Sequence, residues 1–223
     1  MFKDRVIRDD KLIHMKRELG FLDDFLCNLV PKYSDYFLLL GCPREENSLL
    51  EIVKWDKEFT KSVIETSAEE ETRLTGIGIR PSFNRKLPRG FLIRKEMREW
   101  VRYWMELPYI SLYSDASHLE QFLSEMEKRT VGVLHELLSM SLLKKMPVPI
   151  IGKLKDEYRF SNAFASVFTR HSGLFYLSLK GGFKIAVLRE AYQNEELIDR
   201  HPLSLLTRES RPEQRVASVK YTY

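Results

Sequence analysis

Histidine and glutamate stand side by side at His135-Glu136, which begins the H-E-x-x-H pattern of zinc peptidases. In that pattern, two histidines four residues apart on one helix face hold the metal, and the glutamate acts as a base. Position 139 is serine in this chain, so the second histidine ligand is missing. The sequence therefore predicts no metal site. The other histidines are scattered, and His171, which follows a predicted helix, is expected to have a capping or surface role.

Asp115, Ser117 and His118 place a carboxylate, a hydroxyl and an imidazole within four residues, and these are the groups of a hydrolase triad. The start of a helix explains the same residues. Ser117 is a good N-cap for a helix beginning at His118, and Glu120 completes a capping box. We therefore predict a capped helix here. Because no other motif is specific enough to indicate an enzyme, we predict neither a catalytic residue nor a cofactor.

Basic side chains are concentrated between Arg80 and Arg102, where eight of them stand against two acidic residues. The first part, 80–91, is a loop punctuated by proline and glycine. The second part is predicted to be a helix, because its apolar residues lie at i, i+3, i+4, i+7 and i+8. Those residues are Met97, Trp100, Val101, Trp104 and Met105. We expect both tryptophans in the core and the arginines of this helix on the opposite face.

Arginine forks match phosphate oxygens, and their binding to nucleic acid releases counterions. The basic segment therefore predicts a phosphate-contacting surface, and the alternative is a solvated helix face with Glu-Arg pairs. The predicted RNA contacts in this segment are Arg85, Lys86, Arg89, Arg94, Arg98 and Arg102. Arg170, Lys180 and Lys184 would add contacts near a β-hairpin, and Tyr176 of that hairpin would stack on an unpaired base.

The composition of the whole chain sets broad limits on its class. With 36 Lys and Arg against 32 Asp and Glu, the net charge is +4, which an ordinary mildly basic soluble protein would also show. Cys27 and Cys42 are too few for a disulfide framework, and they suit a reducing compartment. No segment approaches the roughly 20 apolar residues that cross a membrane. We therefore predict no membrane partner.

The segment Ser161 to Leu188 has the pattern of a helix, a turn and a β-hairpin. Ser161 is a good N-cap, and Ser172-Gly173 is a typical helix end. From Phe175 onward, apolar and polar residues alternate with the period of a strand. Gly181-Gly182 then supplies the tight turn before the second strand.

The same pattern occurs 138 residues earlier in the chain. Asp23 falls on Ser161 as N-cap, and Phe37 falls on Phe175 at the strand entry, with no gap between them. A match at one fixed offset over cap, helix and strand indicates two copies of one supersecondary unit. A helix feeding a hairpin, with another helix before it, is the layout of a winged helix-turn-helix. Such a layout hints at nucleic-acid binding at the level of the fold alone.

The apolar residues of 125–143 cover most of a helix circumference, which places this helix at the centre of the core. The predicted fold class is therefore mainly α with small β-hairpins (α+β), built as repeated winged-helix-like helix-helix-hairpin units around a central apolar helix. Further helices are predicted at 10–19, 59–75, 150–158 and 190–200.

Three runs of the sequence resemble the plant organelle RNA recognition (PORR) domain of the What's This Factor family. They are residues 87–119, 125–145 and 159–192, and KYSDYFLLL and LEIVKWD in the first unit add to them. The resemblance implies binding of organellar RNA, in particular group II introns, as a splicing factor. It implies mitochondria or chloroplasts as the location, the mitochondrion first, and other splicing factors as partners. The intron is the ribozyme in such systems, so the protein would hold its fold without an active site.

The resemblance implies one RNA-binding domain over residues 1–208, and the lack of periodicity in 209–223 predicts a flexible tail. Within it lie the repeat units at about 10–56 and 150–190, the basic loop and helix at 80–106 and the central helix at 125–143. In the family, a transit peptide and a further stretch of the domain precede the part that Met1 begins, so the chain resembles the C-terminal portion. Acidic residues in the first twenty positions likewise favour neither a signal nor a transit peptide.

Two other readings of the same sequence are a winged-helix regulator that binds DNA, and a scaffold that recruits other splicing factors and touches RNA weakly.

Overall fold

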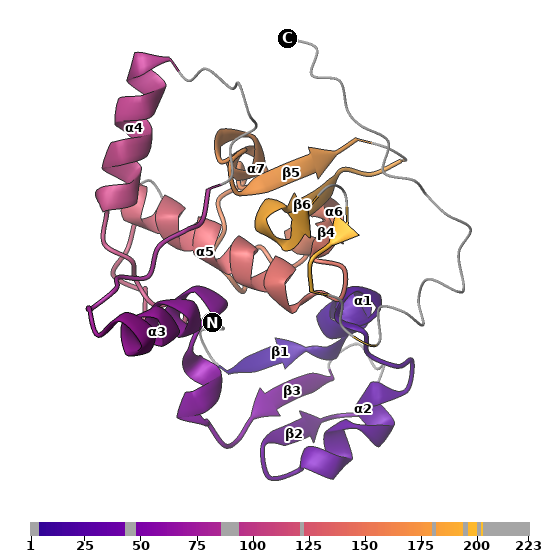
Figure 1. The fold of residues 1–223 in the computed structure, drawn as a ribbon. Coiled ribbons are helices and arrows are strands. Elements are labelled where there is room, and N and C mark those ends of the chain that lie inside the picture. The colour runs from indigo at the N-terminus through magenta and orange to yellow at the C-terminus, as the bar shows by residue number, and fades with distance from the viewer. Residues whose placement is uncertain are drawn as a thin grey trace.

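The computed structural model describes residues 5–42, 48–85, 94–120, 123–179, 182–193, 196–199 and 202. Within these ranges the molecule is α+β, with helices surrounding two small three-stranded antiparallel sheets. In Figure 1 the long helix α5 crosses the middle of the molecule, with one sheet below it and the other above. The fold class predicted from the sequence is confirmed at this level.

Helix α5 (Ser124–Met140) forms the centre of the core. Val131, Val133, Leu134 and Leu138 are all fully buried, as the apolar circumference of this helix predicts. The helix ends at Met140 because Ser141 leaves the helical conformation, and the Leu142 amide then donates to the Glu18 carbonyl instead. The central helix is therefore three residues shorter at its end than predicted.

The first sheet has the strand order β1-β3-β2, and its hairpin is formed by the second and third strands. Helices separate the first strand from the hairpin. In chain order the elements are β1 (Val6–Arg8), α1 (Asp9–Leu19), α2 (Phe25–Asn28), the 3-10 helix η1 (Val30–Tyr33), β2 (Phe37–Leu40) and β3 (Leu49–Ile52).

The second sheet has the corresponding order β4-β6-β5, and again helices lie between its first strand and its hairpin. Its elements are β4 (Lys145–Pro147), α6 (Val148–Gly152), α7 (Ser166–Arg170), β5 (Phe175–Ser178) and β6 (Ile185–Leu188). Strands β2 and β5 begin at Phe37 and Phe175, the offset of 138 found in the sequence.

Helix α1 has its predicted bounds to within one residue, whereas α2, α6 and α7 are shorter than predicted. Helix α6 ends at Gly152, and turns rather than a helix continue to Arg159, whose left-handed φ of 57° is incompatible with a continuing helix. Helix α7 begins at Ser166, and turns occupy the residues after Ser161. Neither predicted N-cap is formed: α2 and α7 each begin without a side-chain capping bond.

Two further helix predictions are wrong. Residues 190–200 instead contain the 3-10 helix η3 (Arg189–Ala191) and the two-stranded ribbon β7 (Tyr192–Gln193) with β8 (Glu196–Leu197). The Ile198 amide closes this ribbon by donating to the Ala191 carbonyl. No helix starts at His118 either, because the Asp115 carboxylate accepts hydrogen bonds from both the amide and the hydroxyl of Ser117 and stabilises a turn. The predicted tail at 209–223 lies outside the described residues.

Two helices lie between the first repeat unit and α5 in the chain. Helix α3 (Val63–Thr75) follows the 3-10 helix η2 (Lys57–Thr60) and starts at a capping box made by Ser62 and Glu65. Helix α4 (Lys95–Glu106) stands at the edge of the molecule, away from both sheets (Figure 1). In the described ranges, no helix has the length and apolar character that crossing a membrane requires.

Candidate nucleic-acid interface

Three arginines of the basic segment form an open stripe along α4. Arg94, at the N-cap, Arg98 and Arg102 are all exposed and lie four residues apart, so each step along the helix is about 6 Å. Within the described part of the chain, no carboxylate lies within ion-pair distance of any of them. Between described residues, one ion pair is seen on α4, and it joins Lys95 to Glu99 at 3.9 Å. The described residues therefore form no Glu-Arg pair along this face, which was the alternative. The stripe presents three charges without a carboxylate partner among these residues.

The C-terminal half of α4 attaches the helix to the protein. Trp104 is 2% exposed and Trp100 packs against the same core, as predicted from their spacing. By contrast, every residue from Arg94 to Glu99 is exposed. The arginine stripe therefore begins on a part of α4 that is surrounded by solvent and ends beside the anchored turn.

Arg85 lies apart from the open stripe. Its guanidinium carbon is 5.7 Å from the centre of the Trp104 ring, a cation–π arrangement, and burial lowers its pKa. Its Nε and one Nη atom are buried, and neither has a hydrogen-bond partner among the described residues. Arg85 thus packs against the anchor of α4 in this structure. Lys86 and Arg89, the next predicted contacts, lie outside the described residues.

Arg170 ends α7 and is half exposed, and its guanidinium lies 3.4 Å from the carboxylate of Glu127 on α5. The same carboxylate is 3.0 Å from Nε2 of His171, and this hydrogen bond lowers the pKa of Glu127. His171 is fully buried, with its ring 4.5 Å from that of Trp104. A surface role for His171 is therefore wrong: its side chain joins α7 to α4 and α5, and burial lowers its pKa.

The second hairpin places Lys184 on the surface, as predicted, while Lys180 lies outside the described residues. Tyr176 is only partly exposed, since it pairs across the sheet with Val187. Phe183, next to Lys184, is 68% exposed and is the better stacking surface. Sequence reasoning assigned Phe183 to the returning strand, although its position directly after the glycine turn was a signal for exposure.

Lys128 is a second residue that sequence reasoning missed. It lies in α5, is 5% exposed, and its Nζ donates to the carbonyls of Trp104, Met105 and Leu107 at 3.3, 3.0 and 2.5 Å. Burial lowers the pKa of its ammonium group. The available signal was a basic residue on a helix predicted to be buried over most of its circumference, because such a charge must find partners when buried.

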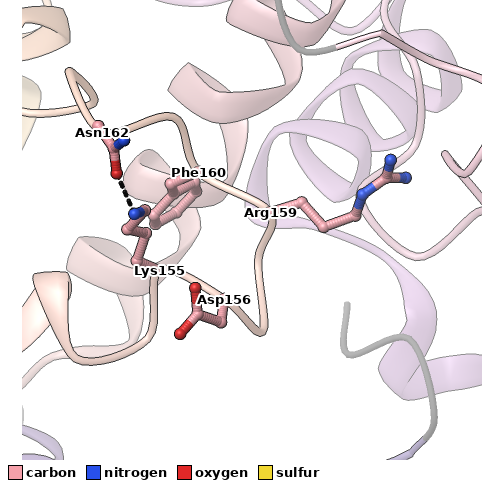
Figure 2. Close-up of a pocket in the computed structure, with 5 residues that line it drawn as sticks. All are labelled: Lys155, Asp156, Arg159, Phe160 and Asn162. Atoms are coloured by element: carbon pink, nitrogen blue, oxygen red, sulfur yellow. Dashed lines mark hydrogen bonds between the residues drawn. The ribbon is translucent and has the colours of Figure 1, made fainter.

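A polar depression of about 260 Å³ lies on the turns that follow α6 and is lined by Lys155, Asp156, Arg159, Phe160 and Asn162. Figure 2 shows Lys155 directed at the amide oxygen of Asn162, to which it donates a hydrogen bond. Arg159 points away and donates to the carbonyl of Ala116 at 2.9 Å. Both cations already serve contacts inside the protein, so this depression is a weaker anion site than α4. Among the described residues, no group of three potential metal ligands occurs.

The described surface thus presents unpaired arginines on α4 and an exposed aromatic ring beside a lysine on the second hairpin. A family model described as the plant organelle RNA recognition domain matches residues 1–210. The chain belongs to the plant organelle RNA recognition family. Its family therefore gives it a role related to organellar RNA, in agreement with the resemblance of the sequence.

Named relatives extend this family assignment. The protein named WHAT'S THIS FACTOR 1 homolog, chloroplastic, of Arabidopsis thaliana is 38% identical over 215 residues, covering 93% of this chain and 40% of its own length. The protein named WHAT'S THIS FACTOR 9, mitochondrial, of the same plant is 33% identical over 115 residues, covering 52% of this chain and 30% of its own length. A third, ROOT PRIMORDIUM DEFECTIVE 1, is 30% identical and is covered over half its length. This plant organelle RNA recognition chain thus spans half or less of these relatives. No solved structure matches it.

Proposed function

We propose that this chain is a non-enzymatic RNA-binding protein that promotes the splicing of organellar group II introns by stabilising the folded intron. The observation that carries the proposal is the arginine stripe of α4, whose three guanidinium groups make no ion pair among the described residues, on a chain of the plant organelle RNA recognition family. A folded intron packs its phosphates closely, and their repulsion opposes folding. Cations fixed on a protein surface offset that repulsion at the points where intron helices meet.

The stripe of Arg94, Arg98 and Arg102 has the length to contact neighbouring phosphates of one strand. Its two ends are about 12 Å apart along the helix, and successive arginines are rotated by about 40°. The stripe therefore turns gradually around α4, as a nucleic-acid backbone turns around its own axis. Phosphate contacts of this kind set position and affinity, and they carry little sequence information.

The two repeat units are proposed to be winged-helix modules. Support comes from their shared order of strand, helices and hairpin, and from the same strand arrangement in β1-β3-β2 and β4-β6-β5. In the second module, Arg170 at the end of α7 and Lys184 on the hairpin would contact phosphates. Phe183 would stack on an unpaired base, because every base offers a ring face regardless of sequence.

The organelle and the partners are also part of the proposal. One relative is named as chloroplastic and another as mitochondrial, so either organelle is a candidate location. The mitochondrion is the first expectation from the resemblance. Other splicing factors are proposed partners. Immunoprecipitation after crosslinking in isolated mitochondria and plastids, followed by sequencing of bound RNA, will identify compartment and transcript together.

Competition binding tests the proposed ligand. The full chain is bound to a labelled, folded group II intron transcript, and unlabelled competitors are added at matched salt. We expect the folded intron to compete better than the same RNA denatured or a DNA duplex of equal length. Preference for the DNA duplex would establish a DNA-binding regulator instead. Equal, weak competition by all three, together with retention of other splicing factors, would establish a scaffold.

A further inference from the structure

Helix α4 packs against the rest of the protein through its C-terminal end. Its last turn contains the buried Trp104, whereas its first turn is fully exposed. Arg94 lies about 20 Å along the helix axis from Leu107. A rotation of about 10° at the held end would therefore move Arg94 by about 3 Å. The placement of the arginine stripe depends on how firmly this one end is fixed.

Lys128 adds polar contacts to the apolar packing that holds this end. A helix leaves the carbonyls of its last turn without partners, and the three donors of an ammonium group can satisfy them. Lys128 supplies those donors to Trp104, Met105 and the following Leu107. Its Nζ also lies 5.2 Å from the centre of the Trp104 ring. One side chain of the central helix thus holds both the backbone end and the anchoring ring of α4.

The surroundings of Lys128 indicate that its charge serves this contact alone. Among the described residues, no carboxylate lies within ion-pair distance of its Nζ, although the side chain is 5% exposed. The negative end of the α4 dipole and the carbonyl oxygens compensate the buried charge. A buried charge compensated by a single helix end is sensitive to that end's position, because a small shift would leave the ammonium group without partners.

Resting on the function proposed above, we infer that Lys128 is a positioning residue for RNA binding: by capping the C-terminal end of α4, it holds the arginine stripe in the register that contacts phosphates. Lys128 does not touch the RNA. It acts through the orientation of Arg94, Arg98 and Arg102.

The test compares Lys128→Met with Arg129→Met in the full chain. Methionine keeps an unbranched stem of similar length but removes the donors. For Lys128→Met, we expect faster hydrogen–deuterium exchange in α4 than in the wild type, with exchange in α5 unchanged. We expect RNA affinity to fall about tenfold and the salt slope of binding to fall by about 0.7 or more, the contribution of one phosphate contact. Lys128→Gln, which keeps two donors on a shorter side chain, should lie between and serves if Lys128→Met folds poorly.

Arg129 is the matched control. It is the next residue of α5 and is almost equally buried, at 7% exposed. Its guanidinium donates to the Leu112 carbonyl and not to α4. Arg129→Met should lower stability without changing α4 exchange or the salt slope. Equal effects of both variants, or an unchanged slope and α4 exchange in Lys128→Met, would overturn the inference. If replacing the stripe arginines leaves RNA affinity intact, the proposed function is wrong and the inference falls with it; if only the Lys128 variants bind normally, the inference alone is wrong.

Discussion

Replacing Arg94, Arg98 and Arg102 together by glutamine is the most direct perturbation of the proposed RNA surface. All three side chains are exposed, and in the described structure they make no ion pair that would be lost. Exposed substitutions of this kind usually change the free energy of unfolding by about 0.5 kcal/mol or less each. The variant should therefore remain folded, and any loss of binding reports on the missing charges.

The expected loss follows from counterion release. Each neutralised phosphate contributes about 0.7 to the salt slope for single strands and about 0.9 for a duplex. Three contacts therefore account for a slope of about 2 to 2.7. At 0.1 M monovalent salt, this corresponds to a loss of affinity of about 100-fold to 500-fold, or about 3 to 4 kcal/mol.

Filter binding to a folded intron transcript at salt concentrations from 0.05 to 0.3 M, on the order of the range where such slopes are linear, measures both quantities. The control replaces Arg17, Lys32 and Lys57 by glutamine, which removes the same net charge from exposed positions on α1, η1 and η2. The control should retain most of the affinity and nearly the whole slope. Equal losses in both variants would show that total charge, and not the stripe, governs binding. A wild-type slope in the stripe variant would refute the proposed contacts.

Four further predictions concern stability, each measured by urea unfolding. Because burial lowers the pKa of His171, the unfolded chain takes up its proton first, so relative to His171→Gln the wild type should lose stability as the pH falls below about 6.5. Burial raises the pKa of Glu136, so relative to Glu136→Gln the wild type should lose stability as the pH rises above about 4.5. Glu136→Leu also removes the acceptor of the Val63 amide at the start of α3, and should cost about 1–3 kcal/mol at pH 7 while the glutamine variant costs less. Gly20→Ala should cost about 1–2 kcal/mol, because Gly20 has a φ of 78° and an added Cβ would lie 2.8 Å from Leu142.

The local periodicity of the sequence was sufficient to predict the strongly patterned elements. The stripe of apolar residues placed Trp100 and Trp104 in the core, and the alternation after Phe175 placed β5 correctly. Helices α2 and α7 were predicted too long, because capping residues indicate where a helix can start and not whether other contacts favour turns. Arg159 is such a case, since this left-handed residue donates to the distant Ala116 carbonyl. The turn at Asp115 is local instead: the Asp115 carboxylate competes with the predicted Ser117 cap by bonding the Ser117 amide and hydroxyl.

The candidate site could be predicted only in part, for a physical reason. Exposure of Arg94, Arg98 and Arg102 follows from the amphipathic pattern of α4 itself. Whether a basic side chain is already bound inside the protein depends instead on residues distant in the chain. The stacking of Arg85 on Trp104 and the pairing of Arg170 with Glu127 both join separate elements, so charge counting alone could not distinguish them from the free stripe.

The polar residues of α5 explain how a small α+β protein can keep several short elements in place. Along one buried helix, Glu127 bonds to His171 behind α7, Lys128 caps α4, Arg129 holds the carbonyl of Leu112, and Glu136 accepts from the first amide of α3. Apolar packing alone tolerates sliding between helices, whereas a buried charge with one set of partners penalises any other arrangement by its desolvation energy. Short helices such as α7 bury too little surface to fix their own orientation. We therefore expect that replacing Lys128 by an apolar residue of similar size would change the placement of the arginine stripe, whereas the same replacement of Arg129 or Glu136 would lower the stability of the protein.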